Sequence, residues 1–389
     1  MAEEKSKKQQ LVDRLYTKKT ILAPMVRCGS FPFRLLCLQN GCDTVFSEET
    51  VAQKVICAKR TINKILNTVD YTDSKTGQIV FRTSKEERDH LVLQLGTPNA
   101  DLALQAANIL IQDVDAIDIN MGCPKRFSVQ GAMGSSLLST PTIACDIIKT
   151  LSTNLSIPIS AKIRLLSGPI ENTIQFILKL QESGASAVTI HCRHVEDHPK
   201  IPADKDIYLQ IENDSRIHIP LIYNGDIYTH EELLQFQKIH PNSGVMIGRG
   251  ALMNASIFNK EIKSVENIIK EYLLISAKYF NRFSNTKYCL WRMLCISSKH
   301  LDEKGDKTHR SKTWEEWGSI WGISKEIETQ LEIIRNKENE LNIYLSEEGG
   351  IAEEEGDTVI NNENQKKKID EGELIRKRLR ENEIKDDIN

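Results

Sequence analysis

The stretch Ala116-Ile117-Asp118-Ile119-Asn120-Met121-Gly122-Cys123-Pro124-Lys125 has the pattern of a buried strand that ends in a loop displaying one cysteine. Short apolar runs of this kind recur along the chain, and helical spacing of apolar residues separates several of them. The eight runs cover residues 21–25, 44–47, 91–95, 116–120, 159–163, 187–191, 220–224 and 245–247. Alternation of strands and helices predicts a parallel sheet.

Eight strand–helix units are the number that closes a (β/α)8 TIM barrel, which we predict for residues 19–257. The alternative, a doubly wound sheet, has fewer strands and a glycine-rich first turn, but no Gly-x-Gly-x-x-Gly follows the first run. Residues 49–88 are too many for one ordinary connection. They contain a turn-forming stretch at 71–77, so we expect an insertion with a hairpin above the barrel.

The segments around the predicted barrel differ from it in composition. Residues 1–18 are polar and lysine-rich, which predicts a flexible arm. Residues 258–344 keep helical spacing only, which predicts a separate helical domain. An RNA-binding face would have the interleaving seen here of Lys278, Arg282, Lys287, Arg292 and Lys299 with Tyr279, Phe280, Tyr288 and Trp291. An amphipathic bundle with a charged surface fits at least equally well. Residues 345–389 are charged and poor in aromatics, which predicts a disordered tail with mixed charge, and a short helix at 374–384 could form there on binding.

Composition limits the class of protein. A chain of 389 residues with 40% hydrophobic residues suits an enzyme with a large core. No apolar run approaches the roughly 18 to 20 residues that cross a bilayer, so we expect no membrane-spanning segment. The nine cysteines form no Cys-x-x-Cys pair, which favours reduced thiols, no metal site and a cytoplasmic location, with the nucleus as a second compartment. The net charge is −3, yet residues 346–389 carry 14 acidic and 8 basic residues, so the rest is mildly basic and permits nucleic-acid binding.

Cys123 is the best candidate for a reacting group. Gly122 and Pro124 restrain its backbone and Lys125 provides a nearby cation, which suits either proton transfer or nucleophilic attack. Taken alone, the loop fits an inert structural cysteine better, because cysteine is among the most often buried residues.

Polar residues follow several of the predicted strands at their carboxyl ends, where barrels carry their chemistry. Gly248-Arg249-Gly250 offers backbone N–H groups and a guanidinium ahead of a helix, which suits a phosphate, although a tight turn with a surface arginine has the same pattern. The neighbouring Asn224-Gly225-Asp226 favours the phosphate site. Lys162 and His191 occupy matching strand positions, where a flavin requires a cation and a hydrogen-bond donor.

These motifs together resemble the FMN-dependent tRNA-dihydrouridine synthases. The matching stretches, in order, are Leu22-Ala23-Pro24-Met25-Val26, Asn120-Met121-Gly122-Cys123-Pro124-Lys125, Ala161-Lys162-Ile163-Arg164, His191-Cys192-Arg193 and Asn224-Gly225-Asp226. Two more stretches resemble the eukaryotic dihydrouridine synthase 2 branch, which acts on uridine 20 of the D-loop, namely Phe81-Arg82-Thr83 and Thr286-Lys287-Tyr288-Cys289-Leu290. The resemblance extends over about residues 20–340.

The resemblance implies reduction of the C5=C6 bond of a tRNA uridine, with FMN as cofactor and NADPH as reductant. Hydride would reach C6 while Cys123 protonates C5, so the thiol would be an acid that must stay protonated. The implied FMN contacts are Pro24, Met25, Val26, Gln94, Lys162, His191, Asn224, Gly225, Asp226, Gly248 and Arg249. The helical domain would hold the tRNA, and we expect a monomer.

Three features depart from the family pattern. Cys192 replaces a common glycine, and Ala132 replaces the second glycine of a Gly-Gly-Met-Gly loop near Cys123. Residues 345–389 are too few and too acidic for the double-stranded RNA-binding domain of animal members, so we expect the tRNA to be held without one. Two rival interpretations are a barrel flavoprotein acting on a free pyrimidine, of the dihydroorotate dehydrogenase type, and a catalytically silent RNA-binding scaffold.

Overall fold

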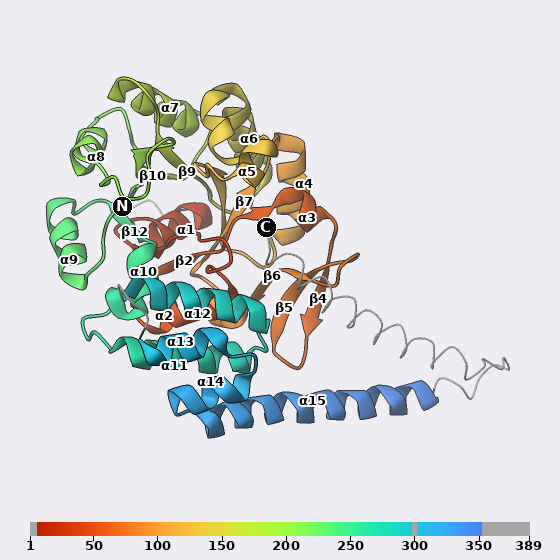
Figure 1. Ribbon diagram of the computed structural model, residues 1–389. Helices are drawn as coiled ribbons and strands as arrows, with labels where there is room; N and C mark the ends of the chain where they lie inside the picture. The colour runs from red at the N-terminus through yellow and green to blue at the C-terminus, as the bar shows by residue number, and fades with distance from the viewer. Residues whose placement is uncertain (1–5, 298–301, 352–389) are drawn as a thin grey trace, which may run out of the picture. The chain divides into compact units, whose positions relative to one another are not determined.

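The computed structural model describes residues 6–297 and 302–351 (Figure 1). Eight parallel strands form a closed ring in which β1 pairs with β12 and β2 pairs with β7. They are β1 (Thr20–Leu22), β2 (Thr44–Phe46), β7 (Leu91–Gly96), β8 (Ala116–Met121), β9 (Ile159–Leu165), β10 (Ala187–His194), β11 (Leu221–Asn224) and β12 (Gly244–Ile247). The predicted TIM barrel is confirmed.

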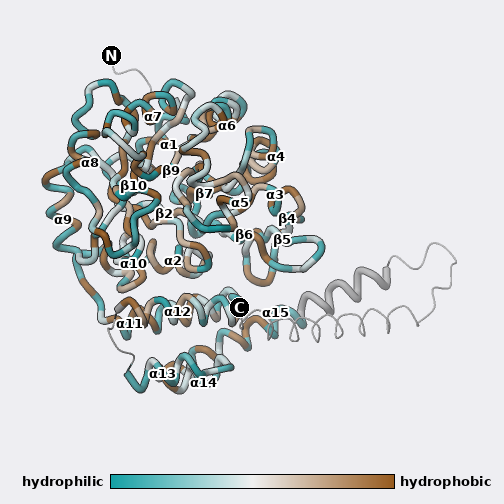
Figure 2. The backbone as a smooth tube through the Cα atoms, turned by 45° about the horizontal axis from the view of Figure 1, so that its top comes forward, coloured by the Kyte–Doolittle hydropathy of each residue, from teal (hydrophilic) through white to brown (hydrophobic). Residues whose placement is uncertain are grey.

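Helices cover the outside of this ring. The longer ones are α2 (Phe31–Gln39), α4 (Ala100–Leu110), α6 (Pro141–Asn154), α7 (Ile170–Glu182), α8 (Lys205–Glu212) and α9 (His230–Ile239). Shorter turns are α3 (Ala52–Ile56), α5 (Arg126–Gln130), α10 (Arg249–Met253), η1 (Lys85–Glu87), η2 (Gly134–Ser139) and η3 (Ala255–Phe258). Their starts follow capping rules, since Asn99 caps α4 and Thr229 with Glu232 forms a capping box at α9. In Figure 2 many helices change between brown and teal along their turns, as helices with one apolar face do.

The barrel wall separates two cores because successive strand residues face opposite sides. Ile117 and its outward-facing equivalents pack against the helices. Ala116 faces inward, and two and four residues further along β8 the same side carries Asp118 and Asn120. The inward series therefore becomes polar towards the carboxyl ends. Its apolar beginning contains Ile21, Ala23, Phe46, Val92, Ala116, Ala187, Ile222 and Met246.

The prediction of a flexible arm is wrong for residues 7–15, which form helix α1 (Lys7–Leu15). Val12, Leu15 and Tyr16 are buried in the interior core and close the amino-terminal end of the barrel. The Leu15 carbonyl also accepts a hydrogen bond from the Thr44 hydroxyl at 2.9 Å. The helix was not predicted because its composition is rich in lysine and only a few of its side chains are apolar. Three buried side chains are nevertheless enough to close this end of the barrel.

The segment between β2 and β7 forms the expected insertion. It contains β3 (Thr50–Val51), which pairs with the end of β7, and an antiparallel sheet of β4 (Ala58–Asn63), β5 (Thr68–Asp73) and β6 (Ile79–Ser84). The predicted hairpin is the turn between β5 and β6. Backbone hydrogen bonds from Asp73 N to Gln78 O (2.8 Å) and from Gly77 N to Asp73 O (2.9 Å) close it.

The chain beyond the barrel is helical, as expected. Its helices are α11 (Val265–Lys278), α12 (Phe283–Ser297), α13 (Glu303–Arg310), α14 (Trp314–Trp321) and α15 (Ser324–Ile351). Helix α11 packs on α2 and α12 packs on α10 (Figure 1), so the chain up to Arg335 is one compact unit. The predicted helical region after the barrel is confirmed, and its helices bury their apolar faces on the barrel instead of forming a compact body of their own.

The predicted disordered tail begins too early. Residues 345–351 form the end of α15, which is one continuous helix from Ser324. The second compact unit of the chain starts at Asn336. The rest of the predicted tail, including the helix expected at 374–384, lies outside the described residues.

Candidate active site

The carboxyl ends of the strands, which we call the mouth of the barrel, bring the predicted site residues to one end of the ring. Gln94 in β7, Lys162 in β9 and His191 in β10 belong to the inward-facing series. Asn224 ends β11 and pairs with His191. The other expected cofactor residues follow β1, β11 and β12. Pro24, Met25, Val26, Gly225, Asp226 and Gly248 stand in the loops after these strands, and Arg249 is the first residue of α10.

A hydrogen-bonded chain runs inside the barrel towards the Cys123 loop. Asp118 accepts from the Ser160 hydroxyl at 2.7 Å and from the Gln94 amide at 2.8 Å. The Gln94 carbonyl oxygen then accepts from the Asn120 amide at 3.2 Å. The other end of the Asn120 side chain accepts from the backbone N–H of Cys123 at 3.0 Å. The position of the cysteine loop is therefore fixed from within the barrel, through Gln94, which was expected near the cofactor, and through Asp118 and Ser160, for which the sequence predicted no role.

Cys123 is half-buried directly after β8. Burial raises the pKa of its thiol, and the nearby Glu49 carboxyl raises it further, while the Lys125 backbone and the Ser128 hydroxyl act in the opposite sense. The net upward shift keeps the thiol protonated at neutral pH, as a general acid requires. Glu49 was missed by sequence reasoning because it is distant along the chain and reaches the thiol only through the closure of the barrel.

His191 lies among cations at the mouth. Burial and these cations lower the pKa of its imidazole to about 2, so the ring is neutral at physiological pH. The cations are Lys162, Arg164, Arg193 and Arg249. Nη1 of Arg193 lies 3.0 Å from Nε2 of His191, and because a guanidinium can only donate, Nε2 is the acceptor. The proton of the neutral ring is therefore on Nδ1, which leaves one donor.

The ammonium group of Lys162 is placed where burial opposes its charge. Burial and Arg164 lower the pKa of its ammonium to about 8, while the Asp118 carboxyl raises it. Within residues 6–297 and 302–351, no protein group accepts a hydrogen bond from this ammonium. Lys162 therefore retains hydrogen-bonding capacity for a ligand.

Asp226 is held between two arginines. It accepts hydrogen bonds from Arg193 and from Arg249, whose other amino group donates to the Pro199 carbonyl at 3.1 Å. Burial opposes ionisation of Asp226, but the hydrogen bond and charge of Arg193, with hydrogen bonds from the Ala203 backbone and the Tyr228 hydroxyl, together lower the pKa of the carboxyl. One carboxylate thus faces two guanidinium groups, and with Lys162 the mouth keeps an excess of positive charge that suits a phosphate.

Two glycines at the mouth cannot carry side chains. A Cβ on Gly225 would lie 2.1 Å from the hydroxyl oxygen of Tyr223, and one on Gly250 would lie 2.3 Å from the Ile227 carbonyl oxygen. Both glycines allow the loops after β11 and β12 to approach closely at the start of α10. The first N–H groups of that helix lack partners within it, which leaves backbone donors beside Arg249.

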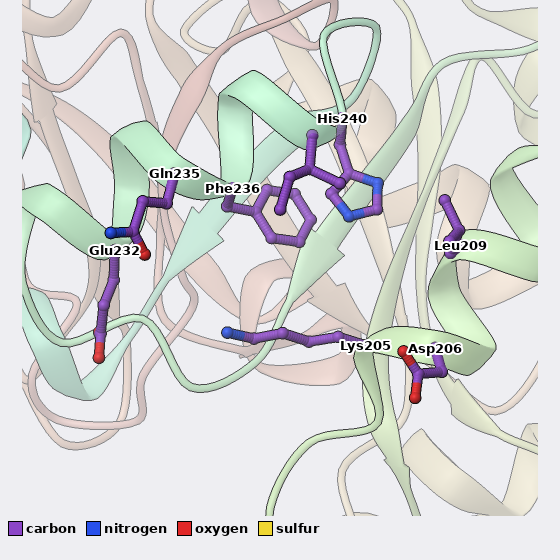
Figure 3. A pocket seen from close by; sticks show the side chains of 8 residues that line it. Lys205, Asp206, Leu209, Glu232, Gln235, Phe236 and His240 are labelled. Atoms are coloured by element: carbon purple, nitrogen blue, oxygen red, sulfur yellow. The ribbon is translucent and has the colours of Figure 1, made fainter.

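The pocket in Figure 3 is separate from this mouth. It lies between α8 and α9 on the outside of the barrel, with a volume of about 260 Å³. Its lining residues are Lys205, Asp206, Leu209, Glu232, Gln235, Phe236, Ile239 and His240. The His240 ring stacks on Phe236 with centroids 4.2 Å apart and its Nδ1 bonds to Glu212, so this histidine has a structural role. None of the predicted site residues lines this pocket.

The predicted RNA-binding face of the helical region is partly engaged within the protein. Lys278 pairs with Glu86 at 3.2 Å, and Lys287 donates to the Ser311 carbonyl at 3.0 Å. The Tyr288 ring packs 4.0 Å from the guanidinium of Arg27 on the barrel. These contacts favour the bundle interpretation for this part of the pattern. Lys299, also predicted on this face, lies outside the described residues.

The described part of the chain has neither a membrane-spanning helix nor a cluster of metal ligands. None of its helices has both the length and the apolar character needed to span a bilayer. No three His, Cys, Asp or Glu side chains among these residues are grouped as metal ligands would be.

Comparison with known proteins gives consistent matches. A family model described as Dihydrouridine synthase (Dus) matches residues 21–336. The tRNA-dihydrouridine(20) synthase of Saccharomyces cerevisiae, whose name specifies NAD(P)+, is 37% identical over 299 residues, covering 72% of this chain and 78% of the relative. The Schizosaccharomyces pombe protein of the same name is 34% identical over 284 residues, covering 71% of this chain. The match spans only 59% of the length of that relative.

Proposed function

The chain belongs to the dihydrouridine synthase family, and on this premise we propose that it reduces a uridine of tRNA to dihydrouridine, with Cys123 as the general acid. The observation that carries the proposal is the state of Cys123. Its thiol follows β8 at the mouth of the barrel, and burial together with Glu49 raises its pKa. A protonated thiol beside a cation-rich mouth suits the delivery of one proton to carbon.

The residues at the mouth fit FMN by their chemistry. Arg249, Gly248 and the first N–H groups of α10 would hold the phosphate, next to the Asn224-Gly225-Asp226 loop. Lys162, with no hydrogen-bond acceptor among the described residues, would supply a cation to the flavin ring system. Gln94, His191 and the loop of Pro24, Met25 and Val26 would complete the contacts. When bound there, FMN would supply the hydride for C6 of the uracil, with NADPH as its reductant.

The residues of this chain would then have distinct tasks. Cys123 holds its proton until the uracil is in place and gives it to C5, and its loop is kept in position by Asn120. Lys162, with a pKa of about 8, is mostly protonated at neutral pH and stabilises negative charge at the mouth. The neutral His191 donates through Nδ1 without adding charge. The uridine has to leave its stack, at a free-energy cost of a few kcal/mol that is lower in a tRNA loop than in a duplex.

The substrate position and the tRNA contacts are the finer part of the proposal. Uridine 20 is supported by the names of two relatives at 34% and 37% identity. The barrel and α11–α14 would hold the tRNA through phosphate contacts, so we expect its binding to weaken steeply as salt concentration rises.

The test is direct. The purified protein should be yellow, and incubation with unmodified tRNA and NADPH should add two hydrogens to a D-loop fragment measured by mass spectrometry. Cys123→Ala should keep the flavin spectrum and lose most of the product. Cys145→Ala, in another partly buried cysteine on α6, should keep both. A folded protein without flavin would contradict the proposal, and reduction of a free pyrimidine instead of tRNA would favour the dihydroorotate dehydrogenase type of enzyme.

A further inference from the structure

Glu49 is a partly buried carboxyl group that no bond-making step of the proposed reaction uses. It lies in the connection between β2 and β3. The Ser128 hydroxyl donates to its Oε1 at 3.1 Å. Oε2 is buried, and no donor among the described residues forms a hydrogen bond with it. Gly96 leaves room for this side chain, because a Cβ there would lie 2.5 Å from Oε1.

Ser128 and Cys123 are packed against the same turn. Gly134 has a φ of +59°, and a Cβ on it would lie 2.4 Å from the Ser128 hydroxyl oxygen and 2.6 Å from the Cys123 carbonyl oxygen. The backbone N–H of Ser135 donates to that carbonyl at 3.0 Å. Helix α5 and turn η2 therefore hold Ser128 and the cysteine loop in a fixed relation to Glu49.

Charges of both signs face Cys123. Lys162 and Arg164 from β9 interact electrostatically with the thiol, and Lys125 is in its own loop. Arg164 also binds the loop directly, through the Gly122 carbonyl at 3.1 Å. These cations stabilise the thiolate, which cannot protonate carbon. Glu49 supplies a carboxyl group near the thiol, and each of the two groups shifts the pKa of the other.

We propose that Glu49, held in place by the Ser128 hydroxyl, is a positioning residue for the general acid that keeps the Cys123 thiol protonated and oriented among the cations of the mouth. The inference rests on the proposed role of Cys123 as an acid. This role of Glu49 also gives a reason for a carboxyl group at this partly buried position. One of its oxygens has no hydrogen-bond partner among the described residues, and burial of a charge there is unfavourable.

The test measures the ionisation of Cys123 without using tRNA. Iodoacetamide reacts with the thiolate, so the rate at which the Cys123 peptide is alkylated, followed by mass spectrometry across pH, reports the thiol pKa. In the flavin-containing protein, Glu49→Gln removes the charge at nearly equal volume. We expect alkylation near neutral pH to become about tenfold faster, which corresponds to a downward shift of roughly one pH unit. Glu49→Asp, which keeps the charge, should recover part of the wild-type profile.

Glu48→Gln is the matched control. Glu48 is the neighbouring carboxyl in the sequence, but one of its oxygens accepts a hydrogen bond from the Arg27 backbone N–H at 2.7 Å, on the loop after β1. Its alkylation profile should match the wild type. A folded Glu49→Gln protein with an unchanged profile would overturn this inference, whether or not the protein modifies tRNA. Failure of the wild-type protein to form dihydrouridine would overturn the proposed function and leave an observed alkylation shift intact.

Discussion

The amide nitrogen of Gln94 donates to Oδ2 of Asp118 at 2.8 Å, and this bond decides which end of the Gln94 side chain faces Asn120. Asp118 is fully buried. Burial raises the pKa of its carboxyl to about 6, although hydrogen bonds from Gln94 and Ser160 and the charge of Lys162 oppose the shift. Asp118 therefore orients the Gln94 side chain inside the barrel, and the burial of its charge lowers the free energy of unfolding at neutral pH.

Asp118→Asn is expected to stabilise the fold at neutral pH and to weaken the site. The pKa of Asp118 in the folded protein lies above the ordinary aspartate value of 3.8, so this carboxyl contributes most stability below pH 3.8 and the contribution is lost as pH rises through about 6. The variant should unfold with a free energy higher by up to ~3 kcal/mol at neutral pH. It should also retain flavin less well, because Lys162 loses its nearby carboxylate.

Urea unfolding at pH 7 and near pH 4 tests this expectation, because the gap between the variant and the wild type should shrink at the lower pH. Asp146→Asn, at an exposed position on α6, is the control and should change stability by less than about 0.5 kcal/mol at either pH. A gap of equal size at both pH values would contradict the assignment of the penalty to the Asp118 charge.

Ala132 has a left-handed backbone, with a φ of +54°, at the place where the family pattern has a glycine. This conformation costs a residue with a Cβ roughly 1 to 2 kcal/mol. Part of that is offset because alanine restricts the unfolded chain more than glycine does. Ala132→Gly should therefore raise the free energy of unfolding by up to about 1 kcal/mol, measured by urea titration. Ala103→Gly, within α4, should have the opposite sign, and equal losses in both variants would argue against strain at Ala132.

The strands could be predicted from the sequence because each carries a short apolar run. The carboxyl ends of all barrel strands lie at one mouth, whatever the order of the strands, so residues at those ends could be expected to lie together. That geometry is why Lys162 and His191 could be grouped before any contact was known. Helix α1 was missed because its apolar residues are few. Glu49 was missed because it comes close to Cys123 only in the folded barrel, and the two residues are distant in the sequence. Arg193 was noticed at the end of its strand, but its place between His191 and Asp226 depends on side-chain geometry that no local pattern reveals.

The ion pair of Arg34 and Glu87 should be essential to stability. Both side chains are almost completely buried, at 2% and 0% exposure, and they join α2 to the turn after the insertion at 2.6 Å. Arg34→Met leaves the Glu87 charge buried without a partner, so we expect a loss of about 3 to 5 kcal/mol in the free energy of unfolding. Adding Glu87→Gln should recover part of the loss. Arg216→Met, which breaks exposed pairs with Glu171 and Asp214, should cost less than about 1 kcal/mol.

Arg249→Ala should weaken flavin retention while leaving the fold intact. Arg249 is more than a third exposed and donates to Asp226, which keeps Arg193 as a second partner, so the carboxylate does not become unpaired. Loss of a charge-assisted hydrogen bond of about 1.5 to 3 kcal/mol corresponds to a dissociation constant roughly 10 to 150 times higher. Flavin fluorescence after dialysis measures it, with Arg216→Ala as the surface control. Unchanged affinity would place the phosphate away from α10, whereas a general loss of folding would mean that Arg249 acts through Asp226 and not on the ligand.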